Sequence, residues 1–127
     1  MSLITGAITQ IIARVKCLEV SEPIRIRPAD CSDPSFKWPA WGKDSGIYSF
    51  ENNRKVLYIG RAFGASLKQR LKYHCASRDN LAWVEVLESA ETQIYVFILP
   101  QEDWYWAASI EAKLNADIST VFGKRMS

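Results

Sequence analysis

Glu111 is the side chain whose position most needs a chemical partner. The segment from Ala107 to Ile118 places Ala107, Leu114 and Ile118 on one apolar stripe of an expected helix, and Glu111 lies on the same stripe. A carboxylate on the packing face of a helix is costly unless a cation or hydrogen-bond donors stabilise it. Its partner is therefore either an arginine in a buried ion pair or a metal ion, and the sequence leaves both open.

Two tyrosines stand beside glycines at the two ends of one expected hairpin. Residues 46–48 read GIY and residues 58–60 read YIG. Because a turn brings the distant ends of antiparallel strands together, Tyr48 and Tyr58 can project toward one place. They form either a cross-strand aromatic pair in the core or part of a site. The glycines, which have no Cβ, would let a nucleic-acid backbone or a neighbouring loop approach closely.

Arg70 and His74 are four residues apart on one face of an expected helix. A guanidinium suits a phosphate, and an imidazole can exchange protons near neutral pH. His74 is the only histidine of the chain, so it is either a surface or capping residue or a catalytic group. A histidine-based metal site is not supported, because no second His and no Asp stands near it. No Ser or Cys has a recognisable base at a suitable spacing, which argues against a covalent nucleophile.

Positive charge is concentrated in the middle of the chain, although the formal net charge is only +2. Residues 54–78 contain no Asp or Glu. Such a stretch is either a solvated helix face or a source of local potential that steers a phosphate backbone. Its cations are Arg54, Lys55, Arg61, Lys68, Arg70, Lys72 and Arg78.

The composition is typical of one soluble globular domain. The chain has 127 residues, 48% of them hydrophobic, and no run approaches the roughly 18 apolar residues of a membrane span. The first residues do not resemble a secretory signal, so we expect a cytoplasmic protein. Cys17, Cys31 and Cys75 have no CxxC spacing, and we expect them to be reduced and structural.

The hydrophobic pattern predicts alternating helices and strands. The proline-rich residues 21–43 are expected to form an ordered loop with an edge strand at 24–27, packed down by Trp38 and Trp41. The other expected elements are a helix from Ile4 to Leu18, a hairpin over 46–59 with its turn at 51–54, a helix at 66–75, a strand at 91–99 and a helix from Asp103 to Ser119.

Taken together, the two tripeptides, Arg70, His74 and Glu111 resemble the GIY-YIG nuclease family over about residues 45–118. The resemblance implies an α+β fold with a small three-stranded antiparallel sheet flanked by helices. It also implies a single domain, 1–127, in which residues 45–122 are the catalytic core. Residues 1–44 would be a helix and loop extension packed on that core.

The resemblance further implies hydrolysis of a phosphodiester with one divalent cation, Mg²⁺ or Mn²⁺. Glu111 would ligate the cation, Tyr48 would deprotonate or orient the attacking water, and Tyr58 would order water or phosphate. Arg70 would hold the scissile phosphate, and His74 would hydrogen-bond or tune the base. A tyrosine hydroxyl has an ordinary pKa of ~10. Either nearby cations must lower the pKa of Tyr48, or its proton must be relayed to another group.

The implied partner is DNA, with RNA not excluded, and no membrane. Family members are usually fused to a module that supplies specificity, so the sequence leaves open a homodimer, a separate specificity partner or cleavage with little sequence preference. Phage or mobile-element, restriction and repair roles all fit. The expected nucleic-acid contacts are Arg61, Lys68, Lys72 and Arg78.

One departure from the family pattern favours a second hypothesis. Family members commonly carry an Asn roughly a dozen residues beyond the metal-binding Glu, where this chain has Phe122 and Gly123 followed by two cations. Asn115 is only one helical turn past Glu111. The alternative is therefore a catalytically weak or inactive module that binds nucleic acid or a protein. A third hypothesis, an interaction protein, rests on the aromatic residues 104–106 as an interface or as a cover of the core.

Overall fold

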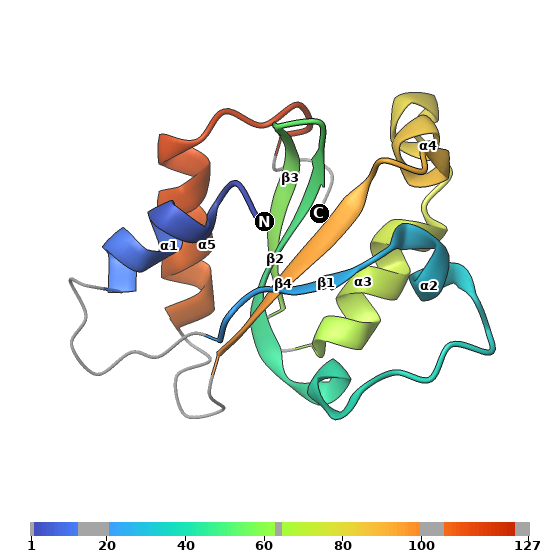
Figure 1. The fold of residues 1–127 in the computed structure, drawn as a ribbon, viewed down its shortest axis with the longest axis horizontal. Helices are drawn as coiled ribbons and strands as arrows, with labels where there is room; N and C mark the ends of the chain where they lie inside the picture. Colours follow the sequence, from blue (N-terminus) through green and yellow to red (C-terminus); the bar gives the residue numbers. More distant parts are fainter. Residues whose placement is uncertain (1, 13–20, 63–64, 100–105, 124–127) are drawn as a thin grey trace.

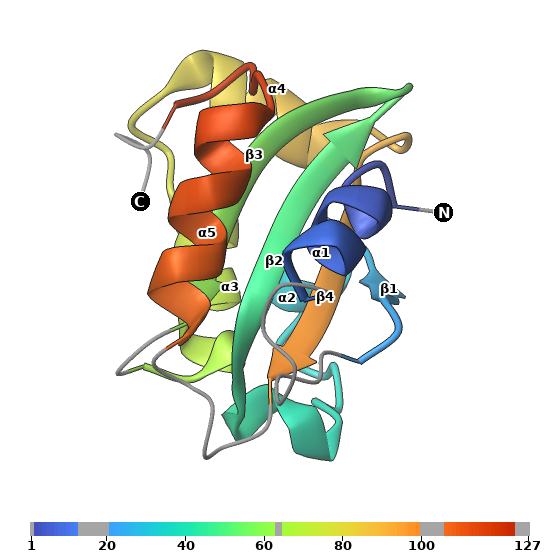
Figure 2. The same ribbon diagram turned by 90° about the vertical axis from the view of Figure 1, so that its left-hand side faces the viewer.

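The computed structural model describes residues 2–12, 21–62, 65–99 and 106–123, and in these residues the chain is an α+β fold. A four-stranded antiparallel sheet is flanked by five α-helices (Figures 1 and 2). The elements are α1 (Thr5–Ile12), β1 (Ile24–Ile26), α2 (Pro28–Ser32), the 3₁₀ helix η1 (Ala40–Lys43), β2 (Ser45–Asn52), β3 (Lys55–Ala62), α3 (Leu67–Ala76), α4 (Leu81–Glu88), β4 (Gln93–Leu99) and α5 (Trp106–Asp117).

The sheet has one more strand than the three that the resemblance implies. Its order is β1-β4-β2-β3, so β2 lies between β4 and β3. The expected edge strand at 24–27 is confirmed as β1, which pairs with β4 through Ile24 opposite Val96 and Ile26 opposite Ile94. The N-terminal extension therefore joins the sheet as its fourth strand.

The hairpin turn is two residues long, whereas the expected turn covered residues 51–54. β2 continues to Asn52 and β3 begins at Lys55, so Asn53 and Arg54 alone form the loop. Both residues have positive φ angles, 46° and 65°, which is the backbone of a two-residue turn that matches the twist of the strands. The register shifts between Phe50 and Glu51, where a bulge adjusts β2 before the turn.

Two hydrophobic clusters cover the two faces of the sheet. On one face, α2, α3 and α4 pack over a cluster that includes Tyr48, Tyr58 and Trp83 (Figure 1). On the other, α1 and α5 lie side by side over a cluster that includes Ile59 and Phe97 (Figure 2). We refer to these as the α3 face and the α5 face.

The proline-rich segment contains more regular structure than expected. Pro28 begins α2, because a proline is well tolerated in the first helical turn. Trp38 and Trp41 pack edge to face, with ring centroids 6.0 Å apart, against the cluster of the α3 face. The expectation that these tryptophans hold the segment down is confirmed, but the expectation of a loop apart from its edge strand is wrong at α2 and η1.

The expected N-terminal helix is present as α1, whose Ile8 is buried with Ile4 just before it on the α5 face. The rest of the expectation to Leu18 lies in residues 13–20, outside the described residues. Four more residues with expected roles are also outside the described residues: Cys17, the expected N-cap Asp103, and Trp104 and Tyr105 of the aromatic group. Trp106 is partly buried against the cluster of the α5 face.

Helix α3 begins with a capping box at Ser66, and its first residue lies one residue after the expected start of the helix at 66. The Ser66 hydroxyl accepts from the Gln69 backbone N–H, while the Gln69 side chain accepts from the Ser66 N–H. The same helix carries Cys75, which is free and buried like Cys31. None of the helices in the described residues is long and apolar enough to span a bilayer.

Candidate functional site

The two tyrosines of the GIY and YIG tripeptides lie on the same face of the hairpin. Tyr48 pairs with Gly60 across the strands and Phe50 with Tyr58, so the tyrosines are diagonal neighbours with ring centroids 6.4 Å apart. Both are buried on the α3 face, Tyr48 completely. The hairpin therefore brings the two tyrosines together inside the protein rather than on its surface.

The glycines of the tripeptides make room for the protein's own atoms, which corrects the expectation that they admit nucleic acid or a loop. A Cβ on Gly60 would lie 2.6 Å from the Tyr48 hydroxyl, so the phenol rests directly on the backbone of β3. A Cβ on Gly46 would lie 2.2 Å from the carbonyl oxygen of Phe97 on β4. Gly60 thus fixes where the Tyr48 hydroxyl can be.

His74 completes the tyrosine cluster from α3. Its Nε2 lies 2.7 Å from the Tyr48 hydroxyl, and its ring centroid lies 5.0 Å from that of Tyr58. The indole N–H of Trp83 on α4 donates to the His74 carbonyl oxygen over 2.9 Å, which ties the end of α3 to α4. Burial, with the nearby Arg70 cation, lowers the pKa of His74 to about 4, so the imidazole is neutral at pH 7.

The Tyr48 hydroxyl keeps its proton in this environment. Burial raises the pKa of the phenol well above its ordinary value, and the neighbouring Tyr58 and Glu111 add to the rise. Arg70 opposes it through its charge and a hydrogen bond. A protonated phenol beside a neutral imidazole is satisfied when the hydroxyl donates to Nε2.

Glu111 forms an ion pair with Arg61, the residue directly after the YIG tripeptide. The Arg61 Nη1 donates to Glu111 Oε2, and the Asn115 Nδ2 donates to Oε1 over 2.8 Å. Glu111 is 2% exposed, whereas the Arg61 side chain is 38% exposed. Of the two partners that the sequence leaves open for Glu111, this conformation contains the arginine.

Sequence reasoning did not assign a role to Asn115. Its signal was present, because an Asn four residues after a Glu lies next to it on a helix. The family comparison looks instead near Phe122, whose ring packs against Trp83 at a centroid distance of 5.1 Å. The part of the sequence expected to carry the distal amide thus holds a partly buried aromatic residue.

The tyrosine cluster and the carboxylate approach strand β3 from opposite faces. Tyr48 and His74 lie on the α3 face, while Glu111 reaches β3 from α5. After α5, the backbone N–H groups of Val121 and Phe122 donate to the carbonyl oxygens of Val56 and Leu57. This segment therefore covers the half of β3 nearest the turn. The stretch of β3 at Gly60 and Arg61 is where both groups meet, at an edge strand of the described sheet.

The expected nucleic-acid contacts are distributed around α3. Lys68 and Lys72 are exposed on that helix, whereas Arg61 is paired with Glu111. Arg78 is exposed, and its guanidinium donates to the carbonyl oxygens of Cys75 and Ser77 at the end of α3. Arg70 on the same helix is partly buried, and its guanidinium lies 5.5 Å from the centroid of the Tyr73 ring.

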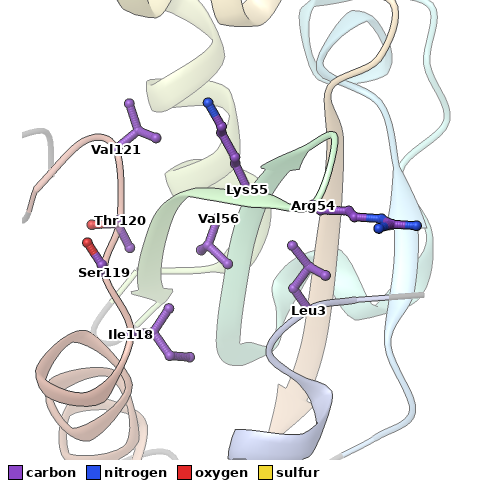
Figure 3. Close-up of a pocket in the computed structure, with 8 residues that line it drawn as sticks. All are labelled: Leu3, Arg54, Lys55, Val56, Ile118, Ser119, Thr120 and Val121. Atoms are coloured by element: carbon purple, nitrogen blue, oxygen red, sulfur yellow. The ribbon is translucent and has the colours of Figure 1, made fainter.

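A groove of about 470 Å³ lies beside the hairpin turn (Figure 3). Apolar side chains, of which Leu3 and Val121 are exposed, form its wall together with Arg54 of the turn and Lys55 at the start of β3. No candidate catalytic residue lines it. Its lining residues are Leu3, Arg54, Lys55, Val56, Ile118, Ser119, Thr120 and Val121.

The donor set around Glu111 limits which metal ions suit it. Among the described residues, no group of three or more His, Cys, Asp or Glu side chains could hold an ion. Mg²⁺ and Mn²⁺ are often bound by one or two carboxylates, with water and substrate phosphate supplying the other oxygens. A single buried carboxylate whose present counter-ion is a partly exposed arginine fits such an ion and does not fit a fully protein-ligated one.

Comparison of the chain with protein family models, with curated proteins and with solved structures finds no match.

Proposed function

We propose that the chain is a divalent-metal-dependent endonuclease that hydrolyses phosphodiester bonds in DNA, similar to the GIY-YIG nucleases. The observation that carries the proposal is the meeting of separate chain segments at Gly60 and Arg61. Tyr48 rests on Gly60, and Arg61 holds Glu111. A purely structural aromatic pair would give no reason for a buried carboxylate and a partly exposed guanidinium at the same point of β3.

Glu111 would hold the cation through its carboxylate once Arg61 moves away. The bound cation would supply Lewis-acid stabilisation of charge on the phosphate oxygens. Arg61 would then be available to the DNA, because it would exchange the carboxylate of Glu111 for a phosphate, which is also an anion. Arg70, which is hydrogen-bonded to Tyr48, would hold the scissile phosphate and offset the charge that grows in the transition state.

Proton transfer would run from Tyr48 to His74. A phenol that keeps its proton cannot remove one from water by itself, so it must give up its own in the same event. The acceptor at 2.7 Å is the neutral His74 Nε2. Tyr48 would accept the proton of the attacking water on its oxygen and pass its own proton to Nε2. Tyr58, whose ring contacts both, would order the water or the phosphate.

Access to these groups would come from the side of the two arginines. Tyr48, Tyr58, His74 and Glu111 are all buried, whereas Arg61 and Arg70 are partly exposed. The phosphate backbone would first meet Lys68, Lys72 and Arg78, the exposed cations. Productive binding then includes a rearrangement of Arg61, which opens Glu111.

Supercoiled plasmid incubated with the purified protein and Mg²⁺ or Mn²⁺ tests the proposal. We expect nicked product that EDTA abolishes and that falls at least about 100-fold in Glu111→Gln, a variant that keeps the volume of the side chain. Glu85→Gln, at an exposed position of α4, is the matched control and should cleave like the wild type. Equal cleavage by Glu111→Gln and wild type would remove Glu111 as the metal ligand.

The second candidate is a module that binds nucleic acid without cleaving it. Phe122 favours this function, because an aromatic residue that packs against Trp83 stands in the part of the sequence where the family pattern has the distal amide. A folded sample that binds a DNA duplex yet gives no product with either metal would support this candidate. Nicking activity that co-purifies with the protein and is lost in Glu111→Gln would eliminate it.

A further inference from the structure

Asn115 divides the two oxygens of Glu111 between two different donors. On α5, the Asn115 amide donates to Glu111 Oε1 over 2.8 Å and to the Glu111 carbonyl oxygen over 3.1 Å. It also lies 3.5 Å from the carbonyl oxygen of Ile59 on β3. Arg61 takes Oε2. One carboxylate oxygen is thus held by an amide of its own helix and the other by a partly exposed arginine of β3.

The bond to the helix carbonyl has an ordinary structural reading. Asn side chains in helices often bond to the carbonyl oxygen four residues earlier. The bond to Oε1 is shorter and charge-assisted, and it holds the carboxylate from α5 itself while Arg61 holds it from β3. If Arg61 leaves, the Asn115 amide still holds the carboxylate in place.

Residues that orient a metal-binding carboxylate commonly change metal affinity when they are replaced. The amide also distinguishes the two carboxylate oxygens. Oε1 accepts from Asn115 on the same helix, whereas Oε2 accepts from Arg61 on β3. The Asn115 amide is neutral, so it can hold Oε1 beside a cation without charge repulsion. A lysine or arginine at position 115 would repel that cation.

We propose that Asn115 is the positioning residue of the metal site: it holds Glu111 Oε1 so that Oε2 is presented to the divalent cation, in place of the distal amide that this chain lacks. The inference rests on the proposed function, since it assigns Glu111 as the cation ligand. It adds a residue and names the oxygen that binds.

Loss of free Mn²⁺, followed by electron paramagnetic resonance as protein is added, measures binding of the metal alone. We expect Asn115→Leu, which keeps the bulk but has no donor, to bind Mn²⁺ about 10-fold more weakly than the wild type or worse. Asn52→Leu, at a partly buried amide near the hairpin turn, should bind like the wild type. Asn115→Ala should behave like Asn115→Leu and serves if the leucine disturbs α5.

Plasmid nicking separates positioning from a general loss of structure. In Asn115→Leu, the Mn²⁺ concentration for half-maximal nicking should rise about 10-fold while the maximal rate stays within about twofold. Wild-type Mn²⁺ binding by both Asn115 variants, with Glu111→Gln binding none, would overturn the inference and leave the proposed function standing. Mn²⁺ binding by Glu111→Gln at the wild-type level would overturn the metal site and the inference with it.

Discussion

The Tyr48 hydroxyl and the His74 Nε2 lie 2.7 Å apart in a part of the protein that solvent does not reach. Tyr48 comes from β2 and His74 from α3, and Gly60 leaves the space in which the phenol approaches the imidazole. Burial shifts the two groups in opposite directions: the phenol holds its proton more tightly and the imidazole accepts one less readily. Both groups are therefore neutral over a wide pH range.

His74 should make the stability of the protein depend on pH. Its pKa is lowered from 6.5 in the unfolded chain to about 4 in the folded one, so below pH 6.5 the unfolded state binds a proton that the folded state does not. The contribution of His74 is fully present above pH 6.5 and is lost as the pH falls toward 4. At about 1.4 kcal/mol per unit of pKa, the loss is roughly 3 kcal/mol.

Urea unfolding from pH 7 to pH 4 measures this dependence against His74→Gln, whose side chain can still accept from Tyr48 but does not titrate. The free energy of unfolding of the wild type should fall more steeply by the stated amount. Parallel pH profiles for the two proteins would show that His74 is protonated equally in both states.

Tyr48→Phe should cost both stability and activity. Removal of the hydroxyl leaves the buried His74 Nε2 without this partner, which is expected to lower the free energy of unfolding by about 1–3 kcal/mol. If Tyr48 passes the proton, the nicking rate should fall about 100-fold or more at saturating Mn²⁺. Tyr95→Phe, the same deletion on the α5 face, should retain nicking. Equal rates for Tyr48→Phe and wild type would exclude the relay.

Gly60→Ala should destabilise the protein through a single methyl group. The new Cβ would lie 2.6 Å from the Tyr48 hydroxyl, so the ring or β3 must move, at a cost of about 1–3 kcal/mol. Gly6→Ala in α1, where nothing lies within 4 Å of the added Cβ, is the control and should be neutral or gain up to about 1 kcal/mol. Thermal unfolding of the two variants beside the wild type measures the difference, which vanishes if Tyr48 does not rest on Gly60.

Arg61→Met should leave Glu111 buried beside Asn115 with its arginine gone. Because Arg61 is partly exposed, we expect a loss of about 1–3 kcal/mol, below the range for fully buried pairs. In the double variant Arg61→Met, Glu111→Gln, most of the loss should be recovered, since the buried charge is gone too. Chemical unfolding of the single and double variants gives the coupling energy. A coupling near zero would mean that the ion pair does not stabilise the fold.

Much of the fold could be predicted because its signals are local. The Ser66 capping box marks the start of α3, and the β-branched and aromatic residues on each side of the Asn-Asn turn predict the hairpin. Helix α4 was not predicted, although Asn80 caps it by accepting from Ala82 and Trp83, because two valines in residues 81–88 weaken the helical signal. The expected edge strand at 24–27 is present as β1, which has three residues and lies at the edge of the sheet.

The sequence by itself determined that Glu111 needs a partner, because the stripe of α5 on which it lies is set by helical periodicity alone. Which partner it has was decided by the tertiary structure. Arg61 is 50 residues away, and its place beside Glu111 depends on how α5 packs across β3. The same holds for the contact of Tyr48 with His74, which requires α3 to cover the hairpin. The burial of a polar side chain follows from the periodicity of its own helix or strand. The atom that stabilises it there comes from a distant element, so only the tertiary structure identifies it.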